Sequence, residues 1–377
     1  MRLRGSGLRA LIALRVGAPD ARLHTAVAAS EEDELRAVTG AFGNRFTSVL
    51  PRTMPVTFSY FTPVSSPAID GLEARTSGRM EADEEVVLKF GMIETGHQVQ
   101  ARCHTLVLDP QGETGFLDIA GATFERLAVV ANEREVRRLG QNADVVVAAC
   151  RMRALHKADA VVVKCGARGS IVVGESGTTL IGPRPTKVVR PIGSGDVFSA
   201  AFALMYGLRG ADAVEAARAA SDFTALFVSD PAEPAIGSAK SISSIPFRDP
   251  VRVYLAGPFF GLGQFWLVDL VCRALLENGA IPFSPFHDVG IGGPEVAGAD
   301  LDGLDSSASV LALLDGFDPG TVFEIGYAAR SGKPVVAYLD PRQREHLTML
   351  EGTGVEVTDD LSTAVYRAIW AAMGTDG

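Results

Sequence analysis

The chain has 377 residues, of which 47% are hydrophobic and 21% charged, a composition typical of a soluble α/β enzyme and unlike that of disordered or fibrous chains. Its length favours two domains, each able to bury a core of its own. The formal net charge of -10 repels nucleic acid backbones and anionic lipid, so we expect small-molecule partners, no polymeric nucleic acid and no membrane.

Cysteine spacing and the N-terminal residues indicate a cytoplasmic location. The four cysteines lie far apart without a CxxC pair, which predicts neither a metal site nor a disulfide framework. Arg9 and Arg15 confine the first apolar stretch to about five residues, which is too short for an export signal. No run approaches the roughly eighteen apolar residues that cross a bilayer.

Apolar, β-branched runs alternate with segments of helical periodicity, a pattern typical of parallel α/β domains. The expected strands are Val145 to Ala149, Ala160 to Val163, Ser170 to Val173, Val251 to Ala256, Val310 to Leu314 and Pro334 to Tyr338. The stretch from Ser229 to Pro250 is rich in Pro, Ser, Ala and Gly and shows neither period, so it is the predicted linker. We place the boundary at residue 244, which divides the chain into domains 1–244 and 245–377.

A glycine-rich turn, RPIGSGDVFSAAFALMYGL, leads into an amphipathic helix after Pro191. The successive amides of Gly193, Ser194 and Gly195 can surround a phosphoryl group at the helix start, and Asp196 is placed to accept a hydroxyl proton. No GxxxxGK[ST] phosphate loop occurs in the sequence. A GxGD turn by itself also occurs commonly at the N-terminus of a helix without binding an anion.

The segments VVANEREVRRLG and VVVKCGARGSIVV precede this turn in the order seen in ribokinase-like carbohydrate kinases of the PfkB family, which residues 1 to about 236 resemble. The resemblance implies a ribokinase-like α/β sandwich, use of ATP and Mg²⁺, Asp196 as the catalytic base and Gly193 to Gly195 as the anion hole. It also implies that Asn132 and Glu135 lie near the magnesium and phosphates. Lys164, Gly166 and Gly169 would lie beside the nucleotide.

Two departures from that pattern leave kinase activity open. The chain begins at RGSGLRALIAL, which matches the glycine-rich helix that follows the family's first strand, so this domain is expected to lack that strand and part of the acceptor site. The usual Thr-rich segment before the GSGD turn is replaced by Val189 to Ile192. A degenerate kinase domain that only senses a nucleotide is therefore an alternative.

The segment VRVYLAGPFF predicts a buried strand that ends in a Gly-Pro turn. It places Tyr254, Gly257 and Phe260 at the carboxyl end of the strand, where ligands bind in open α/β sheets. A later strand leads through DPGT into the helix TVFEIGYAARSG. With Thr321 as N-cap, Glu324 lies in the first helical turn, where the helix dipole favours an ionised carboxylate. Thr-x-x-Glu is also the spacing of a purely structural capping box.

The segments YLAGPFF, SPFHD, ADLDGLD, LLDGFDPGTVFEIGYA and SGKPVVAYL have the order and approximate spacing of the nucleoside 2-deoxyribosyltransferases, which this region resembles over about 120 residues. The resemblance implies a flavodoxin-like or Rossmann-like parallel-sheet domain that needs no cofactor, with Glu324 as the nucleophile. It further implies that Asp300 handles the proton on the departing base, Asp318 orients the base, Tyr254 steadies the nucleophile and Phe260 stacks on the base.

Each of these residues has a structural alternative. Asp300, with Asp302 and Asp305, also fits a solvated helix face, and Asp318 fits simple turn chemistry. Tyr254 fits a core position. The pair His287 and Asp288 is expected to be loop structure without a catalytic role.

The sequence thus predicts a nucleoside deoxyribosyltransferase or N-glycosidase fused to a PfkB-like sugar or nucleoside kinase, acting in nucleoside salvage or catabolism on nucleosides, nucleobases and possibly a pentose. The absence of Arg and Lys between Tyr254 and Arg273 favours nucleosides. A nucleoside 5'-monophosphate N-glycosidase, with Ser306 or Ser307 holding the phosphate, is the alternative. The resemblance also implies a homo-oligomer, with the tail from Glu351 to Trp370 completing a neighbouring subunit's pocket.

Overall fold

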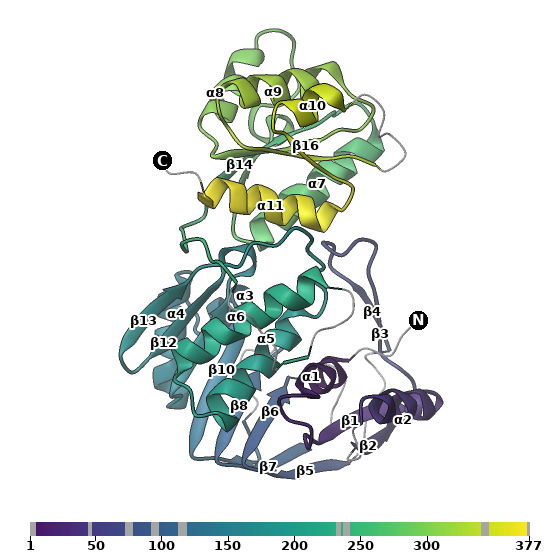
Figure 1. Ribbon diagram of the computed structural model, residues 1–377, viewed down its shortest axis with the longest axis vertical. Helices are drawn as coiled ribbons and strands as arrows, with labels where there is room; N and C mark the ends of the chain where they lie inside the picture. The colour runs from purple at the N-terminus through teal and green to yellow at the C-terminus, as the bar shows by residue number, and fades with distance from the viewer. Residues whose placement is uncertain are drawn as a thin grey trace.

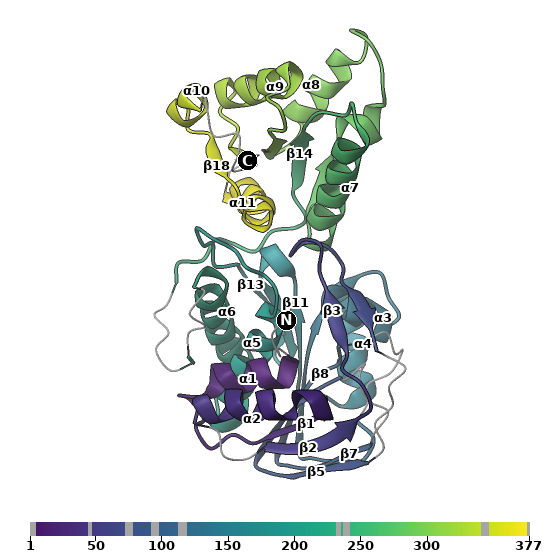
Figure 2. The same ribbon diagram turned by 90° about the vertical axis from the view of Figure 1, so that its right-hand side faces the viewer.

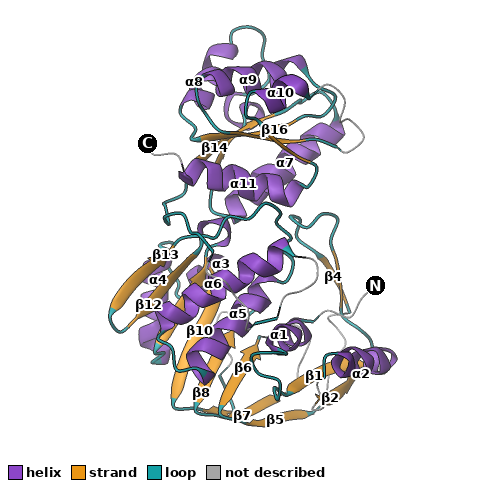
Figure 3. Ribbon diagram, viewed as in Figure 1, coloured by secondary structure: helices purple, strands orange, loops and turns teal. Residues whose placement is uncertain are grey.

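The computed structural model describes residues 5–43, 47–71, 78–91, 98–111, 119–230, 235–236, 242–340 and 347–374. The chain forms two α/β regions, one above the other, and helix α11 (Leu361–Gly374) lies near their junction (Figure 1). Each region is built around a sheet that is covered by helices on both faces (Figure 3). The α/β fold class expected from the sequence is confirmed.

The main N-terminal sheet has the strand order β13-β12-β11-β10-β8-β6. Its strands are β6 (Val86–Phe90), β8 (Thr105–Asp109), β10 (Arg126–Asn132), β11 (Ala160–Lys164), β12 (Ser170–Gly174) and β13 (Gly177–Ile181). The first four run parallel, and β12 and β13 add antiparallel strands at one edge. Because successive side chains of a strand point to opposite faces, this sheet needs helices on both sides.

Two helical layers meet that need. The helices α1 (Ser6–Leu14), α5 (Ser194–Ala203) and α6 (Ala213–Ser229) cover one face, where Ala128 and Val130 are buried. The helices α3 (Glu133–Leu139) and α4 (Val145–His156) cover the other, where Leu127 and Val129 are buried.

Smaller elements complete this region. They are β1 (Leu23–Ala28), η1 (Ala29–Glu31), α2 (Glu32–Ala41), β2 (Thr47–Arg52), β3 (Thr57–Ser59), β4 (Ala68–Asp70), β5 (Arg79–Asp83), β7 (Gln98–Arg102) and β9 (Ala122–Thr123). The elements α2, β1, β2, β5 and β7 lie at its end away from the C-terminal region, and β3 extends toward that region (Figure 2). β1 pairs with β2, β3 with β4, and β5, β7 and β9 form a small parallel sheet.

The C-terminal sheet is fully parallel and has the order β15-β14-β16-β17-β18. Its strands are β14 (Arg252–Ala256), β15 (Ile281–Phe283), β16 (Ser309–Leu313), β17 (Val335–Tyr338) and β18 (Glu356–Thr358). The helices are α7 (Leu262–Glu277), α8 (Ala297–Asp305), α9 (Pro319–Arg330), α10 (Thr348–Gly352) and α11 (Leu361–Gly374). Numbered within the domain, the order is 2-1-3-4-5, which is the flavodoxin-like arrangement.

One expected strand is wrong. Val145 to Ala149 begins helix α4, because the Asp144 side chain accepts hydrogen bonds from the amides of Val146 and Val147 and so caps a helix. Ala148, Ala149 and Met152 then pack on the sheet. The cap and this packing outweigh the preference of three consecutive valines for strands.

The apolar face of α11 packs on the C-terminal sheet of its own chain, with Ala364, Val365, Ala368 and Ile369 fully buried. Trp370 also reaches the N-terminal region, where its indole N–H donates to the carbonyl of Ala167 over 2.8 Å. Among the described helices, none is long and apolar enough to span a membrane.

Candidate active sites

The C-terminal site lies where the order of the strands reverses, between β14 and β16, because parallel sheets leave a crevice at the carboxyl ends of such strands. Tyr254 lies on β14, and Glu324 lies on α9, which follows β16. The Tyr254 hydroxyl donates a hydrogen bond of 2.6 Å to Glu324 Oε1. Tyr254 is fully buried, whereas Glu324 remains partly exposed to solvent.

The helix that carries Glu324 starts earlier than expected. Its N-cap is Asp318, whose Oδ2 accepts from the Thr321 amide at 2.8 Å and from Thr321 Oγ1 at 3.0 Å. Thr321 is therefore not the cap, and Glu324 lies in the second turn rather than in a capping box. Asp318 performs the turn chemistry that its sequence context suggested.

The position of Glu324 also changes its protonation. Burial raises its pKa to about 7, the hydrogen bond from Tyr254 lowers it, and the charges of Asp300 and Asp318 raise it. The expectation that the helix dipole keeps Glu324 fully ionised is wrong, because desolvation dominates and the dipole acts mainly in the first turn. Burial, with the negative charge of Glu324, raises the pKa of Tyr254, which stays a proton donor.

Asp300 lies on α8, close enough to Glu324 to raise its pKa. Its Oδ1 is buried and has no hydrogen-bond partner among the described residues, and burial raises its own pKa. Asp302 and Asp305 are exposed instead, and Asp305 accepts from the Tyr327 hydroxyl at 3.0 Å. The three acids therefore differ, and of the three Asp300 is the one close enough to raise the pKa of Glu324.

The other predicted residues of this site are spread along the same edge of the sheet. Gly257 is buried directly after β14, whereas Phe260 is 79% exposed just before α7. His287 and Asp288 lie in the short helical turn η4 (Pro285–Val289) and make structural contacts. Asp288 accepts a hydrogen bond from the Ser284 amide at 2.8 Å, and His287 forms a 2.8 Å contact with Asp269.

The N-terminal site borders a cavity of about 1820 Å³ between α1, β1 and the start of α5. The cavity brings together Gly193, Gly195, Asp196, Asn132 and Glu135 from separate parts of the sequence. Ser194 does not line this cavity; it is the first residue of α5, directly after Gly193. Gly193 has a φ of +86°, which a residue with a side chain rarely adopts.

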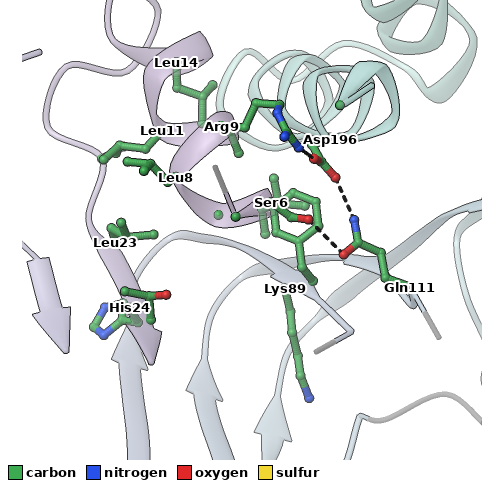
Figure 4. A pocket seen from close by; sticks show the side chains of 18 of the residues that line it. Ser6, Leu8, Arg9, Leu11, Leu14, Leu23, His24, Lys89, Gln111 and Asp196 are labelled. Carbon is green, nitrogen blue, oxygen red and sulfur yellow. Dashed lines mark hydrogen bonds and ion pairs between the residues drawn. The ribbon is translucent and has the colours of Figure 1, made fainter. Parts of the chain in front are cut away.

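Asp196 is held by two side chains that the sequence did not single out (Figure 4). Arg9 of α1 forms an ion pair with Oδ2, and Gln111 Nε2 donates to Oδ1 over 2.7 Å. Ser6 in turn donates to Gln111 Oε1 over 3.1 Å. Gln111 follows the buried strand β8 by two residues, and its place at the carboxyl end of that strand could have identified it as a site residue.

A second buried cluster lies behind Asp196. Asp109, at the end of β8, is fully buried, and its Oδ2 accepts from Lys164 Nζ and Ser199 Oγ, both at 2.7 Å. Lys164 is the predicted nucleotide-side lysine, and Asp109 is a polar residue at a strand end that the sequence reading missed. Burial raises the pKa of Asp109, whereas its ion pair with Lys164 opposes that shift.

Asn132 and Glu135 form a reciprocal capping box at the start of α3. Asn132 Oδ1 accepts from the Glu135 amide, and Glu135 Oε2 accepts from the Asn132 amide, both at 2.9 Å. Burial raises the pKa of Glu135, and the nearby Lys164 lowers it. This capping box fixes the start of α3 and the orientation of both side chains.

Gly166 and Gly169 do not line the cavity. They bound the turn η2 (Gly166–Arg168), which lies against the C-terminal region. Gly166 faces Asn278, at the end of α7, and Ala167 accepts the hydrogen bond from Trp370.

Two buried carboxylates, Asp109 and Glu135, could be ligands of a divalent cation. Asp109 Oδ1 is buried without a hydrogen-bond partner among the described residues, and Glu135 is close enough to interact with Lys164 and Asp109. Magnesium takes one or two carboxylates together with phosphate oxygens, so Asp109 and Glu135 fit such an ion. Within the described ranges, no group of three or more His, Cys, Asp or Glu side chains forms a metal site by itself.

Two family models match separate parts of the chain. Residues 91–233 match the pfkB family carbohydrate kinases, and residues 253–360 match nucleoside 2-deoxyribosyltransferase. Both resemblances inferred from the sequence are confirmed over these ranges. No curated protein sequence matches the chain.

Solved structures similar to this chain include three sugar or nucleoside kinases. Ribokinase from Thermotoga maritima is 17% identical, with a TM-score of 0.46 over 64% of this chain and 84% of its own. Fructokinase from Vibrio cholerae O395, with bound fructose, ADP and calcium, is 14% identical, with a TM-score of 0.46 over 62% and 89%. Aminoimidazole riboside kinase from Salmonella enterica is 14% identical, with a TM-score of 0.41 over 60% and 85%.

Proposed function

Because the chain joins a PfkB carbohydrate kinase region to a nucleoside 2-deoxyribosyltransferase region, two families of enzymes, we propose that it breaks the N-glycosidic bond of nucleosides with Glu324 as nucleophile. The observation that carries this proposal is the hydrogen bond from Tyr254 to Glu324 at the edge of a parallel sheet, where the strand order reverses. It holds one oxygen of a carboxylate in place while that side chain stays partly open to solvent.

In the proposed reaction, the ionised Glu324 attacks the sugar carbon that bears the base. The bond between this carbon and the base nitrogen breaks, and a glycosyl ester forms on Glu324. Asp300, whose pKa is raised, supplies the proton that the departing base takes up. Water or a second base then attacks the same carbon and frees Glu324. We propose that Asp318 and Phe260 contact the base and Gly257 the substrate; no cofactor is needed.

The proposed substrate is a nucleoside rather than a nucleoside 5'-monophosphate. The turn after β14 has no Arg or Lys before Arg273, and phosphate recognition normally uses such cations. The serines Ser306 and Ser307 are engaged elsewhere, since both hydroxyls donate to the Gly303 carbonyl. This internal bonding weakens the alternative in which they hold a phosphate.

Replacing Glu324 with Gln tests the proposal directly. Incubation with a panel of nucleosides, with and without a free base, and identification of the products by mass should show base release or exchange by the native protein. Glu324→Gln should lose at least about a thousandfold of this rate, because the attacking group is gone. Glu277→Gln, which removes an exposed carboxylate on α7, is the matched control and should leave the rate unchanged. Full turnover by Glu324→Gln would exclude the mechanism.

A second candidate function is phosphoryl transfer at the N-terminal site. Asp196 lies in the first turn of α5, next to Gly193 and Gly195, on a cavity large enough for a sugar. Kinases of the PfkB family use ATP and a divalent cation, and here Asp109 and Glu135 would hold the cation, which neutralises phosphate charge. We propose Asp196 as the base, once Arg9 and Gln111 release it to an acceptor hydroxyl.

The remaining proposals concern the whole protein. We place the domain boundary at residue 244 and the protein in the cytoplasm, where its four cysteines, which are free, would stay reduced. A homo-oligomer is proposed on the exposed apolar side chains that border the glycosyl site. These are Phe260, Leu262, Ile291 and Phe323.

A further inference from the structure

The turn predicted to lie beside a nucleotide is covered by the other half of the chain. Trp370 of α11 donates to the carbonyl of Ala167, in the middle of η2, over 2.8 Å. Asn278 lies against Gly166, and the Arg168 guanidinium lies 5.3 Å from the ring of Phe247 in the segment that links the two regions. Three separate segments of the C-terminal half therefore pack on this one turn.

The segment that leads into the anion hole is covered in the same way. The amide of Val189, four residues before Gly193, donates to Thr363 Oγ1 of α11 over 3.0 Å in a buried contact. Val189, Ala167 and Val228 of α6 are each at most 8% exposed, and all three belong to the hydrophobic core formed around α11. Figure 2 shows α11 directly above this part of the N-terminal region.

The cavity, in contrast, lies beside α1, β1 and β2. It reaches Gly193, Gly195 and Asp196 and also Asn132 and Glu135, but it includes no residue from 164 to 169 or from 188 to 191. Phosphoryl transfer places the attacking and leaving oxygens roughly in line. With the acceptor in the cavity, the rest of a phosphoryl donor must extend toward η2 and Val189, where α11 lies.

We infer that α11 closes the donor side of this site to a nucleoside triphosphate, so that the site takes a phosphate group that carries no nucleoside. The inference rests on the proposed phosphoryl site and is independent of the glycosyl chemistry. The residues that exclude the nucleoside by their bulk are Trp370, which lies on Ala167 of η2, and Thr363, which lies on Val189 of the segment before the anion hole.

Binding of two magnesium complexes, tripolyphosphate and ATP, to the full chain tests the inference by calorimetry. The native protein should bind ATP about tenfold or more weakly than tripolyphosphate, since both carry a chain of three phosphates and the nucleoside is the bulky difference. Trp370→Ala, which opens space beside Ala167, should bring the two affinities within about threefold. Trp370→Phe keeps the bulk and should behave as the native protein does.

Trp266→Ala is the matched control, because Trp266 makes a different contact between the two halves. Its ring meets that of Phe61 at 5.0 Å, away from η2, so its removal should leave the preference for tripolyphosphate unchanged. ATP binding to the native protein as tightly as tripolyphosphate, or an unchanged ratio in Trp370→Ala, overturns the inference. Loss of tripolyphosphate binding in every variant instead refutes the proposed phosphoryl site on which it rests.

Hydrogen exchange on the native protein provides a measurement that needs no folded variant. The Val189 amide should exchange slowly without any ligand, because Thr363 accepts its hydrogen bond in a buried contact. Adding ATP should leave the exchange of residues 166–170 and 188–192 unchanged. Slower exchange in both segments with ATP would show that a nucleotide enters, and the inference would fail.

Discussion

The Tyr254 hydroxyl donates to Glu324 Oε1 over 2.6 Å and so joins the first strand of the C-terminal sheet to the helix after its third strand. This bond favours the ionised form of Glu324, whereas burial and two neighbouring acids favour the protonated form. The balance leaves a carboxyl group whose pKa is about 7. Near neutral pH, both forms are therefore populated.

The rate of base release should rise with pH through about 7, because only the carboxylate form of Glu324 can attack the sugar. Tyr254→Phe removes the hydrogen bond that lowers this pKa, so the midpoint of kcat/KM against pH should move to higher pH. Rates of both proteins between pH 5 and 9 measure the shift. Coincident profiles would contradict the role of Tyr254 in the ionisation of Glu324.

Glu324→Gln should stabilise the protein at high pH. The pKa of Glu324 is 4.5 in the unfolded chain and about 7 in the folded one, so the stability that its protonated form contributes is lost as pH rises through 7. A neutral Gln has no such loss. In urea unfolding, the free energy of unfolding of the variant relative to the native protein should therefore increase by at most about 3 kcal/mol from pH 4 to pH 8. An equal difference at both pH values would argue against a raised pKa.

Gly303→Ala should reduce base release without changing any reacting group. A methyl group at Gly303 would overlap the Phe283 ring and push α8, which carries Asp300, away from Glu324. We expect a loss of about 1–3 kcal/mol in the free energy of unfolding together with a lower kcat. Gly298→Ala is the control on the same helix, because its methyl group would meet no atom within 4 Å.

Arg9 and Asp196 should show strong coupling in a double-mutant cycle. Their side chains are 14% and 9% exposed, so removing Arg9 leaves a largely buried carboxylate that keeps the hydrogen bond from Gln111 but has lost its ion pair. Arg9→Met and Asp196→Asn should each cost about 3 kcal/mol or more in chemical denaturation, and the double variant much less than their sum. Additive losses would mean that the ion pair contributes little to stability.

The sequence by itself determined the features that depend on local order. A strand, a turn and a helix follow one another around Glu324, which was expected near the carboxyl edge of a parallel sheet, and a glycine-rich turn leads into the helix that carries Asp196. Apolar periodicity identified strands that are buried on both faces, although three valines after Asp144 were mistaken for one. These signals act over a few residues and are therefore legible in a single chain.

Only the tertiary structure decided what these residues meet. The cap of the Glu324 helix, the partners of Asp196 and the contact of Trp370 with Ala167 join residues whose separation ranges from 3 to 203 positions. The pKa of Glu324 follows from burial by distant segments and opposes the local effect of the helix dipole. Desolvation depends on everything packed around a group. A local pattern therefore predicts which residue lies at a site, but it predicts neither the charge of that residue nor its exposure to solvent.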